Sequence, residues 1–338
     1  MNLADKLAHH YGTRNNGVVC SPARRNKYLM QEAIRAAGIR AIMQQLCSSI
    51  EECAAFYNSL PEPQICIVKP NESAGSDSIF KCSSLDDVLN AFSSIHLKKN
   101  SLGQVNRGAL CQEYLSGTEF VIDGVSRDGT YKVTAVWEYD KRTINNSNFV
   151  YFGMRLRSAV DEHTLAMIEY ASHVVKTLEI SHGPSHMEII NTTSGPCLVE
   201  VGSRCHGGEG TWMSVVDECI GYNQLEATLN CYLRPDRFDE LPFRPVLKNE
   251  GCELFLVSSQ TGVVSDIPGI EKIRSLGSFK RMEMLCQPGS HIKPTTDCFT
   301  RPGSVQMINA SGYHLEKDYD FIRDLERNGE LFEVINEA

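Results

Sequence analysis

The chain has 338 residues, of which 42% are hydrophobic and 22% charged, so it can bury two or three globular cores and is neither disordered nor fibrous. A formal net charge of −9 argues against a nucleic acid as its main ligand, because nucleic-acid-binding proteins usually carry a basic field. No apolar run reaches the ~18 residues of a membrane span, and the first residues lack a signal-peptide core. We therefore expect a cytoplasmic protein with no membrane partner.

The cysteines are the next compositional feature. There are 13 of them, scattered from Cys20 to Cys298, and none forms a C-x-x-C pair. This pattern disfavours a disulfide framework and a zinc ribbon, so we expect reduced residues of the core. Cys205 precedes His206 and is the alternative, a thiol nucleophile, although adjacent side chains seldom face each other.

Helices dominate the first hundred residues of the chain. We expect them over residues 5–11, 26–37, 48–57 and 83–95, the second closed by Gly38 and the last two opened by serine caps. Between the last two helices, the β-branched run from Ile65 to Lys69 predicts a buried strand, and residues 100–108 predict a polar linker.

Extended segments follow from residue 109 onward. Strands are expected over 110–115, 119–126, 131–139 and 150–154, separated by turn sequences, and these fit an antiparallel sheet. A helix over 161–178 then precedes a hairpin formed by strands 185–192 and 197–201. Residues 212–235 are expected to be helical. The last 90 residues are expected to hold short strands over 253–258, 282–286 and 304–309 and a charged helix over 316–327.

The first candidate site follows the strand that ends at Lys69. Small polar residues come at once, in the order Asn71-Glu72-Ser73-Ala74-Gly75-Ser76-Asp77-Ser78. A glycine among them lets backbone N–H groups approach anionic oxygens, and Lys69 adds a positive charge. The segment predicts a phosphate-binding loop, although strands that end in Lys-Pro and loops rich in Ser and Gly are common without a ligand.

The second candidate site is a pair of glutamates in the late hairpin. Glu188 and Glu200 both have apolar neighbours, among which a carboxylate is costly to bury without a partner. Two carboxylates on paired strands can share a divalent cation, and Mg²⁺ prefers one or two carboxylates together with phosphate oxygens. Either glutamate alone is more simply explained as a surface residue. Together with Lys69, Gly75 and Arg204 they predict a metal–nucleotide site.

The order of these motifs resembles the ATP-grasp superfamily over roughly residues 20–215. The resemblance rests on Lys27, Val68-Lys69-Pro70, the loop Ser73-Ala74-Gly75-Ser76, Gln112-Glu113-Tyr114-Leu115 with Gly117 and Glu119, and then Glu188, Glu200 and Arg204. The segments Gly183-x-x-His186-x-Glu188 and Arg204-Cys205-His206-Gly207-Gly208 are similar to the amino-acid ligase branch, which includes dipeptide ligases and carnosine-synthase-like enzymes.

The resemblance implies an α+β fold, in which two α+β subdomains grip ATP and a β-rich lobe follows. It divides the chain into a remnant of an N-terminal Rossmann-like domain (1–25), the small ATP-grasp subdomain (26–105), the large subdomain with the metal site (106–235) and a C-terminal lobe (236–338). So short a front part suggests a truncated gene model, a fragment, or a minimal form. In the last case a homodimer or another partner would complete the acceptor site.

For the nucleotide, the resemblance implies roles for three groups of residues. Lys27 and Lys69 would contact the phosphates of ATP, with the loop that holds Ser73, Ala74, Gly75 and Ser76 closing over them. The backbone of Gln112-Glu113-Tyr114-Leu115 would meet adenine, and Glu119 would bind the ribose hydroxyls. Glu188 and Glu200 would hold Mg²⁺, with Mn²⁺ as an alternative, between the β- and γ-phosphates.

For the substrates, the implied residues lie near the metal strand. Arg204 would contact the transferred phosphoryl group or a substrate carboxylate. His186 shares a strand face with Glu188 and would orient the acid or assist deprotonation of the amine, unless it is only structural. Arg127 is a weaker substrate candidate, and the loop of His206, Gly207 and Gly208 would bind the first substrate.

The implied activity is that of an ATP-dependent carboxylate–amine ligase. A carboxylate would take the γ-phosphoryl group of ATP, and an amine would displace phosphate to form an amide, with an amino acid as the donor or the acceptor. Two positions depart from the family pattern: Gly202 stands where an asparagine is frequent, and Ser78 where a second glycine is frequent. The alternatives are a non-catalytic ATP-binding regulatory subunit and an ATP-grasp enzyme with a non-amino-acid acceptor.

Overall fold

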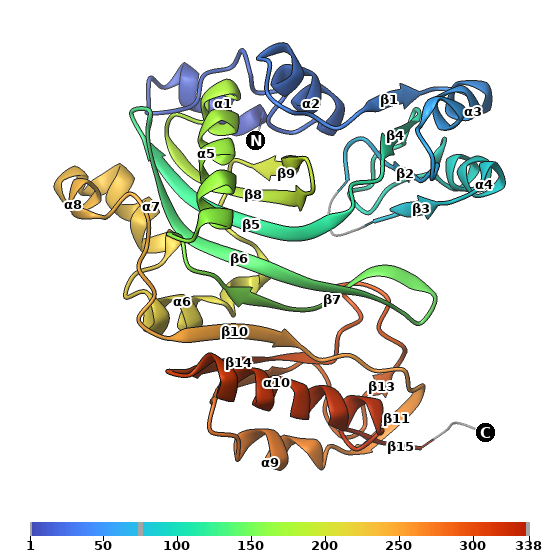
Figure 1. Ribbon diagram of the computed structural model, residues 1–338, viewed down its shortest axis with the longest axis vertical. Coiled ribbons are helices and arrows are strands. Elements are labelled where there is room, and N and C mark those ends of the chain that lie inside the picture. The colour runs from blue at the N-terminus through green and yellow to red at the C-terminus, as the bar shows by residue number, and fades with distance from the viewer. Residues whose placement is uncertain (1, 74–76, 336–338) are drawn as a thin grey trace. The chain divides into compact units, whose positions relative to one another are not determined.

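The computed structural model describes residues 2–73 and 77–335, which form two compact units (Figure 1). Unit 1 comprises Met1–Val133, Glu162–Cys205 and Ala227–Phe243, and unit 2 comprises Thr134–Asp161, His206–Glu226 and Arg244–Ala338. Each unit is thus assembled from segments that are separated in the sequence. The division into four consecutive parts stays a prediction.

The early helices begin where their caps predict. After α1 (Asn2–His10), helix α2 (Lys27–Ala36) starts behind Asn26, whose side chain accepts a hydrogen bond from the Leu29 N–H. Helix α3 (Ile50–Ser59) is capped in the same way by Ser49, and α4 (Leu85–Ile95) has a complete capping box. The four predicted helices of the first hundred residues are confirmed.

An antiparallel sheet in unit 1 has the order β1-β4-β2-β3. Its strands are β1 (Gln44–Cys47), β2 (Cys66–Lys69), β3 (Phe80–Cys82) and β4 (Ala109–Glu113). Helices α3 and α4 pack together and against this sheet (Figure 1). The predicted strand 110–115 is therefore real, but it pairs with β1 and β2 rather than with the sheet that follows, because the chain leaves extended pairing after Glu113.

Three other strands of unit 1 pair in antiparallel fashion: β5 (Gly117–Arg127), β8 (Gly183–Thr192) and β9 (Gly195–Gly202), with β8 between the other two. Helix α5 (Glu162–Thr177) packs on β8 and β9. The predicted hairpin and the preceding helix are thus confirmed.

The last segment of unit 1 holds most of α7 (Gln224–Leu233) and all of α8 (Pro235–Glu240). Lys132 Nζ donates to the backbone carbonyls of Phe238 and Asp239 in α8 at 2.9 and 2.8 Å.

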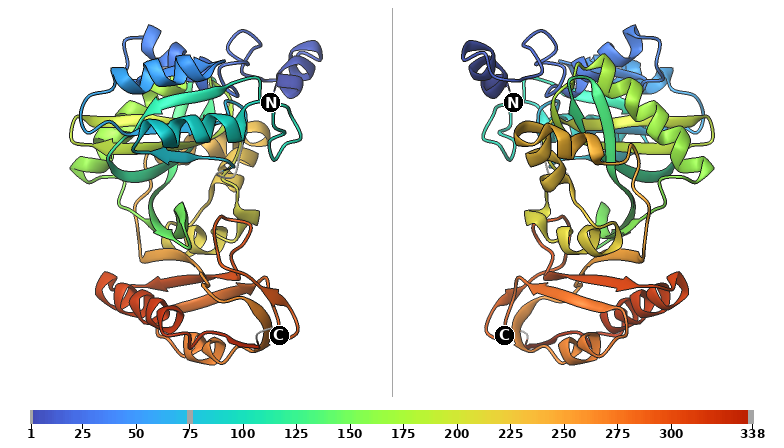
Figure 2. Two further views of the ribbon diagram at one scale, coloured as in Figure 1. Left: turned by 90° about the vertical axis from the view of Figure 1, so that its right-hand side faces the viewer. Right: turned by 90° about the vertical axis from the view of Figure 1, so that its left-hand side faces the viewer.

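Unit 2 contains a sheet in which β6, β7, β10, β14 and β12 are successive neighbours. These strands are β6 (Thr130–Ile144), β7 (Ser147–Leu156), β10 (Glu250–Phe255), β12 (Phe279–Met284) and β14 (Gly303–Asn309). Helix α10 (Gly312–Arg327), red in Figure 2, lies along β10 and β14. A small sheet joins β11 (Gly262–Asp266) to β13 (His291–Ile292) and β15 (Glu333–Ile335).

Short helices complete unit 2. They are η1 (Gly208–Gly210), α6 (Met213–Cys219) and α9 (Gly269–Arg274). The helix expected over 212–235 is broken, because residues 221–223 leave the helical conformation at Gly221, where φ is +106°. Among the described helices, none is long and apolar enough to span a membrane. All the cysteines are free thiols and most are buried.

Candidate functional site

The two glutamates of the late hairpin face each other. Glu188 of β8 and Glu200 of β9 are direct partners in the antiparallel register. Directly opposed side chains lie on the same face of a sheet, so the two carboxylates are neighbours. Their side chains are 16% and 29% exposed, which is intermediate between core and open surface. The register shifts immediately after Glu188, and such a bulge re-aims the side chains beside it.

Lys27 connects this pair to the predicted phosphate loop. Its Nζ lies 2.7 Å from Glu200 Oε2 and donates to the Ser73 carbonyl at 2.9 Å. The base of the loop is fixed to the start of α2, because the Tyr28 N–H donates to Asn71 Oδ1 at 3.0 Å. The first turn of α2 is thereby held between the glutamate hairpin and the loop.

Lys69, at the end of β2, is buried close to the same charges. Burial lowers the pKa of its ammonium group to about 8, and the nearby Lys27 acts in the same direction. The carboxylates that oppose this shift are those of Glu200, Glu188 and Glu119. The structure therefore gathers the two predicted phosphate lysines and three predicted carboxylates into one charged cluster within unit 1.

The loop after Lys69 is described only in part. Ser73 Oγ donates to Asp77 Oδ2 at 2.6 Å, and the Asp77 carboxylate also accepts from the Ser101 N–H at 2.8 Å. Ser78, where a glycine is frequent in the family, has a left-handed φ of 54°. The predicted loop residues Ala74, Gly75 and Ser76 lie outside the described residues.

The predicted adenine strand is the end of β4 and the residues after it. Gln112 Nε2 donates to Gln44 Oε1 at 3.0 Å, and Leu115 packs with Ile42 and Cys197. The N–H groups of Glu113 and Tyr114 donate to the carbonyls of Met43 and Ile65 at 2.9 and 3.2 Å. Those two backbone donors are therefore already used inside unit 1.

His186 is held between two carboxylates. Its Nδ1 lies 2.8 Å from Asp123 Oδ1, and its Nε2 lies 3.9 Å from Glu188 Oε1. Burial opposes the charged form, but Asp123 and Glu188 outweigh it and raise the pKa of His186 to about 9. The expectation that His186 shares a face with Glu188 is confirmed by this distance.

Asp123 is a site residue that the sequence reasoning missed. It is fully buried on β5, directly opposite His186 in the register of β5 and β8. The sequence does contain an indication that Asp123 is buried with a partner, because it is the one acid in the apolar run Phe120-Val121-Ile122-Asp123-Gly124-Val125. A carboxylate buried in such a strand needs a partner, and here the partner is an imidazole.

Gly202 makes room for Arg204. A Cβ atom at Gly202 would lie 3.2 Å from Arg204 Cγ and 3.4 Å from Arg204 Cζ. Arg204 Nη1 also donates to the Cys205 carbonyl at 2.9 Å. The guanidinium side chain thus lies over the glycine that pairs with His186 across β8 and β9. A side chain at position 202 would therefore require the Arg204 side chain to shift by a few tenths of an ångström.

Other candidates have structural contacts of their own. Arg127 donates to the Cys231 carbonyl and is 12% exposed, so it is anchored to α7 rather than being a solvated turn residue. The thiol of Cys205 lies 3.7 Å from Thr228 Oγ1, and burial raises the pKa of this thiol, which disfavours a thiolate nucleophile.

The predicted substrate loop of His206, Gly207 and Gly208 belongs to unit 2. The His206 N–H donates to Gln224 Oε1 at 2.7 Å, and its ring stacks on Trp212 with centroids 5.0 Å apart. Trp212 Nε1 donates to the Gly207 carbonyl at 2.7 Å. These contacts fix the conformation of the loop within unit 2.

The amino-acid sequence is similar to those of known proteins. The ATP-grasp domain family matches residues 62–212. Dapdiamide A synthase of Enterobacter agglomerans is 32% identical over 317 residues, which cover 93% of this chain and 74% of that protein. The L-arginine-specific L-amino acid ligase of Bacillus subtilis is 25% identical over 289 residues, which cover 84% of this chain and 66% of that protein.

Solved structures show the same fold. The L-amino acid ligase of Bacillus licheniformis superimposes with a TM-score of 0.79 and 20% identity, over 100% of this chain and 78% of that chain. The N5-carboxyaminoimidazole synthase of Aspergillus clavatus gives a TM-score of 0.70 and 14% identity, over 97% of this chain and 80% of that chain. The predicted α+β, ATP-grasp fold is confirmed. The chain belongs to the ATP-grasp family, in its amino-acid ligase branch, and is an ATP-dependent carboxylate–amine ligase.

Proposed function

We propose that the protein joins the carboxylate of one amino acid to the amine of a second one at the charged cluster of unit 1. The observation that carries this proposal is the pairing of Glu188 with Glu200 beside Lys27 and Lys69. The name of one relative, the L-arginine-specific L-amino acid ligase, supports amino acids as the substrate class.

Glu188 and Glu200 fit a Mg²⁺ ion. Two neighbouring carboxylates on one sheet face offer the oxygen ligands that Mg²⁺ prefers, and both are open enough to leave positions for phosphate oxygens. When bound, the metal supplies positive charge to the β- and γ-phosphate oxygens. Mn²⁺ accepts the same ligands and is expected to replace it. Gly202 offers no side-chain ligand, so water would fill the position that an asparagine takes elsewhere.

Lys27 and Lys69 are proposed to bind the phosphates. Lys27 already contacts both Glu200 and the Ser73 carbonyl, so its ammonium group lies between the glutamate pair and the start of the loop. Lys69 is buried, and a bound phosphate would favour its charged form. Ser73, whose carbonyl accepts from Lys27, is proposed to lie beside the phosphates.

The nucleoside is proposed to lie along the residues between β4 and β5. The N–H groups of Glu113 and Tyr114 are used inside unit 1, so the adenine contact falls mainly to Leu115, beside Gln112. Glu119 follows on β5 and is near enough to Lys69 to influence its pKa, which suits a carboxylate that binds the ribose hydroxyls next to the phosphate groups.

The reaction requires two bond exchanges. An oxygen of the donor carboxylate forms a bond to the γ-phosphorus while the bond to the β–γ bridging oxygen breaks, which gives an acyl phosphate and ADP. The acceptor amine then forms a C–N bond to the acyl carbon, the C–O bond to the phosphate breaks, and the proton lost by the amine goes to the leaving phosphate or to solvent. Arg204 is proposed to stabilise the negative charge of the transferred phosphoryl group.

His186 is proposed to orient the acid substrate rather than to deprotonate the amine. Both of its ring nitrogens face carboxylates, so each acts best as a hydrogen-bond donor. The loop of His206, Gly207 and Gly208 stays a candidate for binding the substrate carboxylate. Arg127 is a weaker candidate, because its guanidinium group already donates to the Cys231 carbonyl in α7. A homodimer or a partner that completes the acceptor site, and a cytoplasmic location, stay predictions.

The proposal is tested by phosphate release from ATP and Mg²⁺ with pooled amino acids, followed by mass spectrometry of the products. We expect ADP and phosphate to form only with particular amino acids, together with a new amide mass. ADP binding is measured in parallel. Tight binding without turnover for any acid and amine would contradict the proposal and favour the regulatory subunit.

A further inference from the structure

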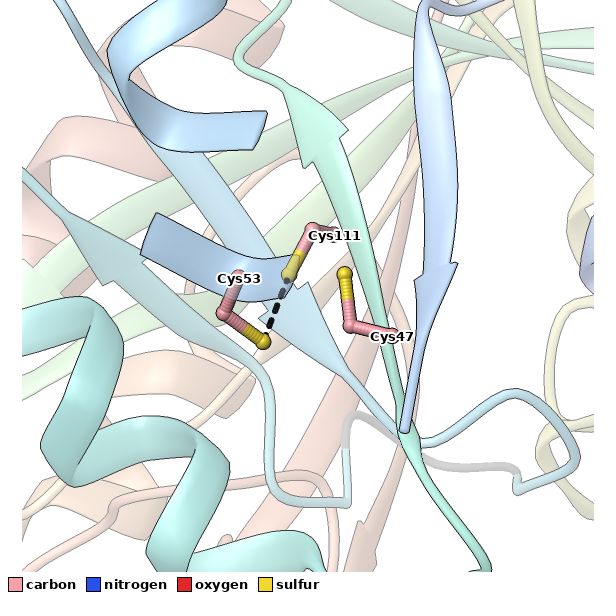
Figure 3. A group of neighbouring side chains, drawn as sticks. All are labelled: Cys47, Cys53 and Cys111. Carbon is pink, nitrogen blue, oxygen red and sulfur yellow. Dashed lines mark hydrogen bonds between the residues drawn. The ribbon is translucent and has the colours of Figure 1, made fainter. Parts of the chain in front are cut away.

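Three buried thiols meet in the core of the β1-β4-β2-β3 sheet (Figure 3). Cys47 ends β1, Cys53 lies in the first turn of α3, and Cys111 lies in the middle of β4. None of them is exposed to solvent. Their sulfur atoms all lie within 4.8 Å of one another, and Cys111 donates a hydrogen bond to Cys53 at 3.6 Å. Elements far apart in the sequence thus bring three soft ligand atoms together.

The separations suit a small thiophilic cation. Zn²⁺ binds thiolates at about 2.3 Å in tetrahedral geometry, which places neighbouring sulfur atoms about 3.8 Å apart. The 3.6 Å between Cys53 and Cys111 is close to that value, and the 4.8 Å limit on the whole group requires only small side-chain shifts. A hard cation such as Mg²⁺ would find no oxygen ligand among these side chains.

A fourth sulfur is within reach. Cys66 is buried on β2 and lies diagonally from Cys111 on the same face of the sheet, because Cys66 is opposite Glu113 and Val68 is opposite Cys111. Metal binding needs thiolates, so each of these thiols must lose its proton when a cation binds.

We propose that Cys47, Cys53 and Cys111, with Cys66 as the fourth ligand, bind one thiophilic d¹⁰ cation of the Zn²⁺ class. Each thiol releases its proton to solvent as its sulfur binds the metal. The ion joins β1, β2, β4 and α3, and so holds the sheet whose β2 ends at Lys69 and whose β4 carries Gln112. This inference does not rest on the proposed amino-acid substrates. The simpler reading is that the cysteines only fill the core as small apolar side chains.

The experiment uses Co²⁺, which reports tetrahedral thiolate ligation by visible d–d bands and an ultraviolet sulfur-to-metal charge-transfer band. Co²⁺ is added to the full-length reduced protein without air, both in the native state and during refolding, because the site is buried. We expect one Co²⁺ per chain with thiolate bands, its displacement by one equivalent of Zn²⁺, and no displacement by Mg²⁺. Absence of these bands under both conditions would overturn the proposal.

Cysteine variants distinguish Co²⁺ binding at this cluster from Co²⁺ binding at other thiols of the chain. Cys53→Ala and Cys111→Ala should weaken Co²⁺ binding by more than about tenfold. Cys252→Ala is the matched control, because Cys252 is equally buried but lies in unit 2, and it should bind Co²⁺ like the unmodified chain.

Circular dichroism checks that each variant folds. Thiolate bands that persist in folded Cys111→Ala, or that vanish in Cys252→Ala, would place the metal elsewhere. If Cys111→Ala does not fold, thiol counting on the unmodified chain decides: at least three thiols must become protected by Zn²⁺.

Discussion

Glu188 and Glu200 are direct partners across the β8–β9 hairpin, and this pairing organises the whole candidate site. Two like charges so close together are unfavourable unless cations lie between or beside them. Lys27 bonds directly to Glu200, and Lys69 lies near both carboxylates. The pair thus explains why two lysines from separate segments are drawn to one place, before any metal or nucleotide is bound.

Replacing either glutamate by glutamine should remove Mg²⁺-dependent turnover. Glu200→Gln and Glu188→Gln keep the side-chain size but lose the charge that a metal needs, so we expect ADP formation to fall by about 10²-fold or more. Both residues are partly exposed, so the melting temperature should change little. Glu283→Gln, on β12 of unit 2, is the control and should leave turnover intact. Normal turnover in Glu200→Gln would disprove the metal assignment.

Lys69 should make nucleotide affinity depend on pH. The pKa of Lys69 is lowered to about 8, so its ammonium is charged below that pH and neutral above it. ADP affinity, measured by titration calorimetry, should fall as the pH rises from 7 to 9. Lys69→Met should weaken ADP binding by about 10- to 100-fold at pH 7 and remove most of the pH dependence. An unchanged pH profile in this variant would assign the titration to another group.

Asp123 should act as a positioning residue for His186. Asp123→Asn keeps a hydrogen-bonding group beside Nδ1 but removes the charge, so kcat should fall while ADP affinity changes little. Asp123→Ala leaves a buried imidazole without its partner and should lower the free energy of unfolding by about 3–5 kcal/mol. Denaturant unfolding and steady-state kinetics separate the two effects. Equal loss of ADP affinity and kcat in Asp123→Asn would indicate a purely structural role.

Restoring the asparagine that is frequent in the family at position 202 should harm this enzyme. A Cβ at Gly202 would press on Arg204, so Gly202→Asn should displace the guanidinium and lower kcat by about tenfold or more. Gly202→Ala tests the steric part alone and should show a smaller effect of the same sign. Activity that rises in Gly202→Asn would mean that an added oxygen ligand outweighs the position of Arg204.

Short sequence features, such as helix caps and turns, were sufficient to predict many of the helices and strands and part of the candidate site. Caps at Ser49 and Ser84 located two helices, and the turn after Ser194 set the hairpin in which Glu188 meets Glu200. The sequence could not predict β1 and β3, because they have four and three residues and lie at the edges of their sheet, without a clear alternation of apolar residues.

Long-range partners were the harder part of the prediction. The assignment of residues 110–115 to the same sheet as the strands that follow was wrong, because pairing between distant segments has no local signal. The same holds for Asp123 with His186, which are 63 residues apart, and for Cys53 with Cys111, which are 58 residues apart. Each of these contacts depends on strand register or on a helix packing over a sheet, neither of which a short window of sequence contains.

The three-segment construction of unit 1 has a consequence for how the protein is made. Lys132 is bound by backbone carbonyls of α8, and Arg127 by a carbonyl of α7, so the sheet with Glu188 and Glu200 is completed by residues up to Phe243. During synthesis, about a hundred residues between these partners must leave the ribosome before the lysine finds them. Unit 1 is therefore completed late during synthesis, and a chain released before residue 243 would expose an incomplete unit to chaperones and proteases.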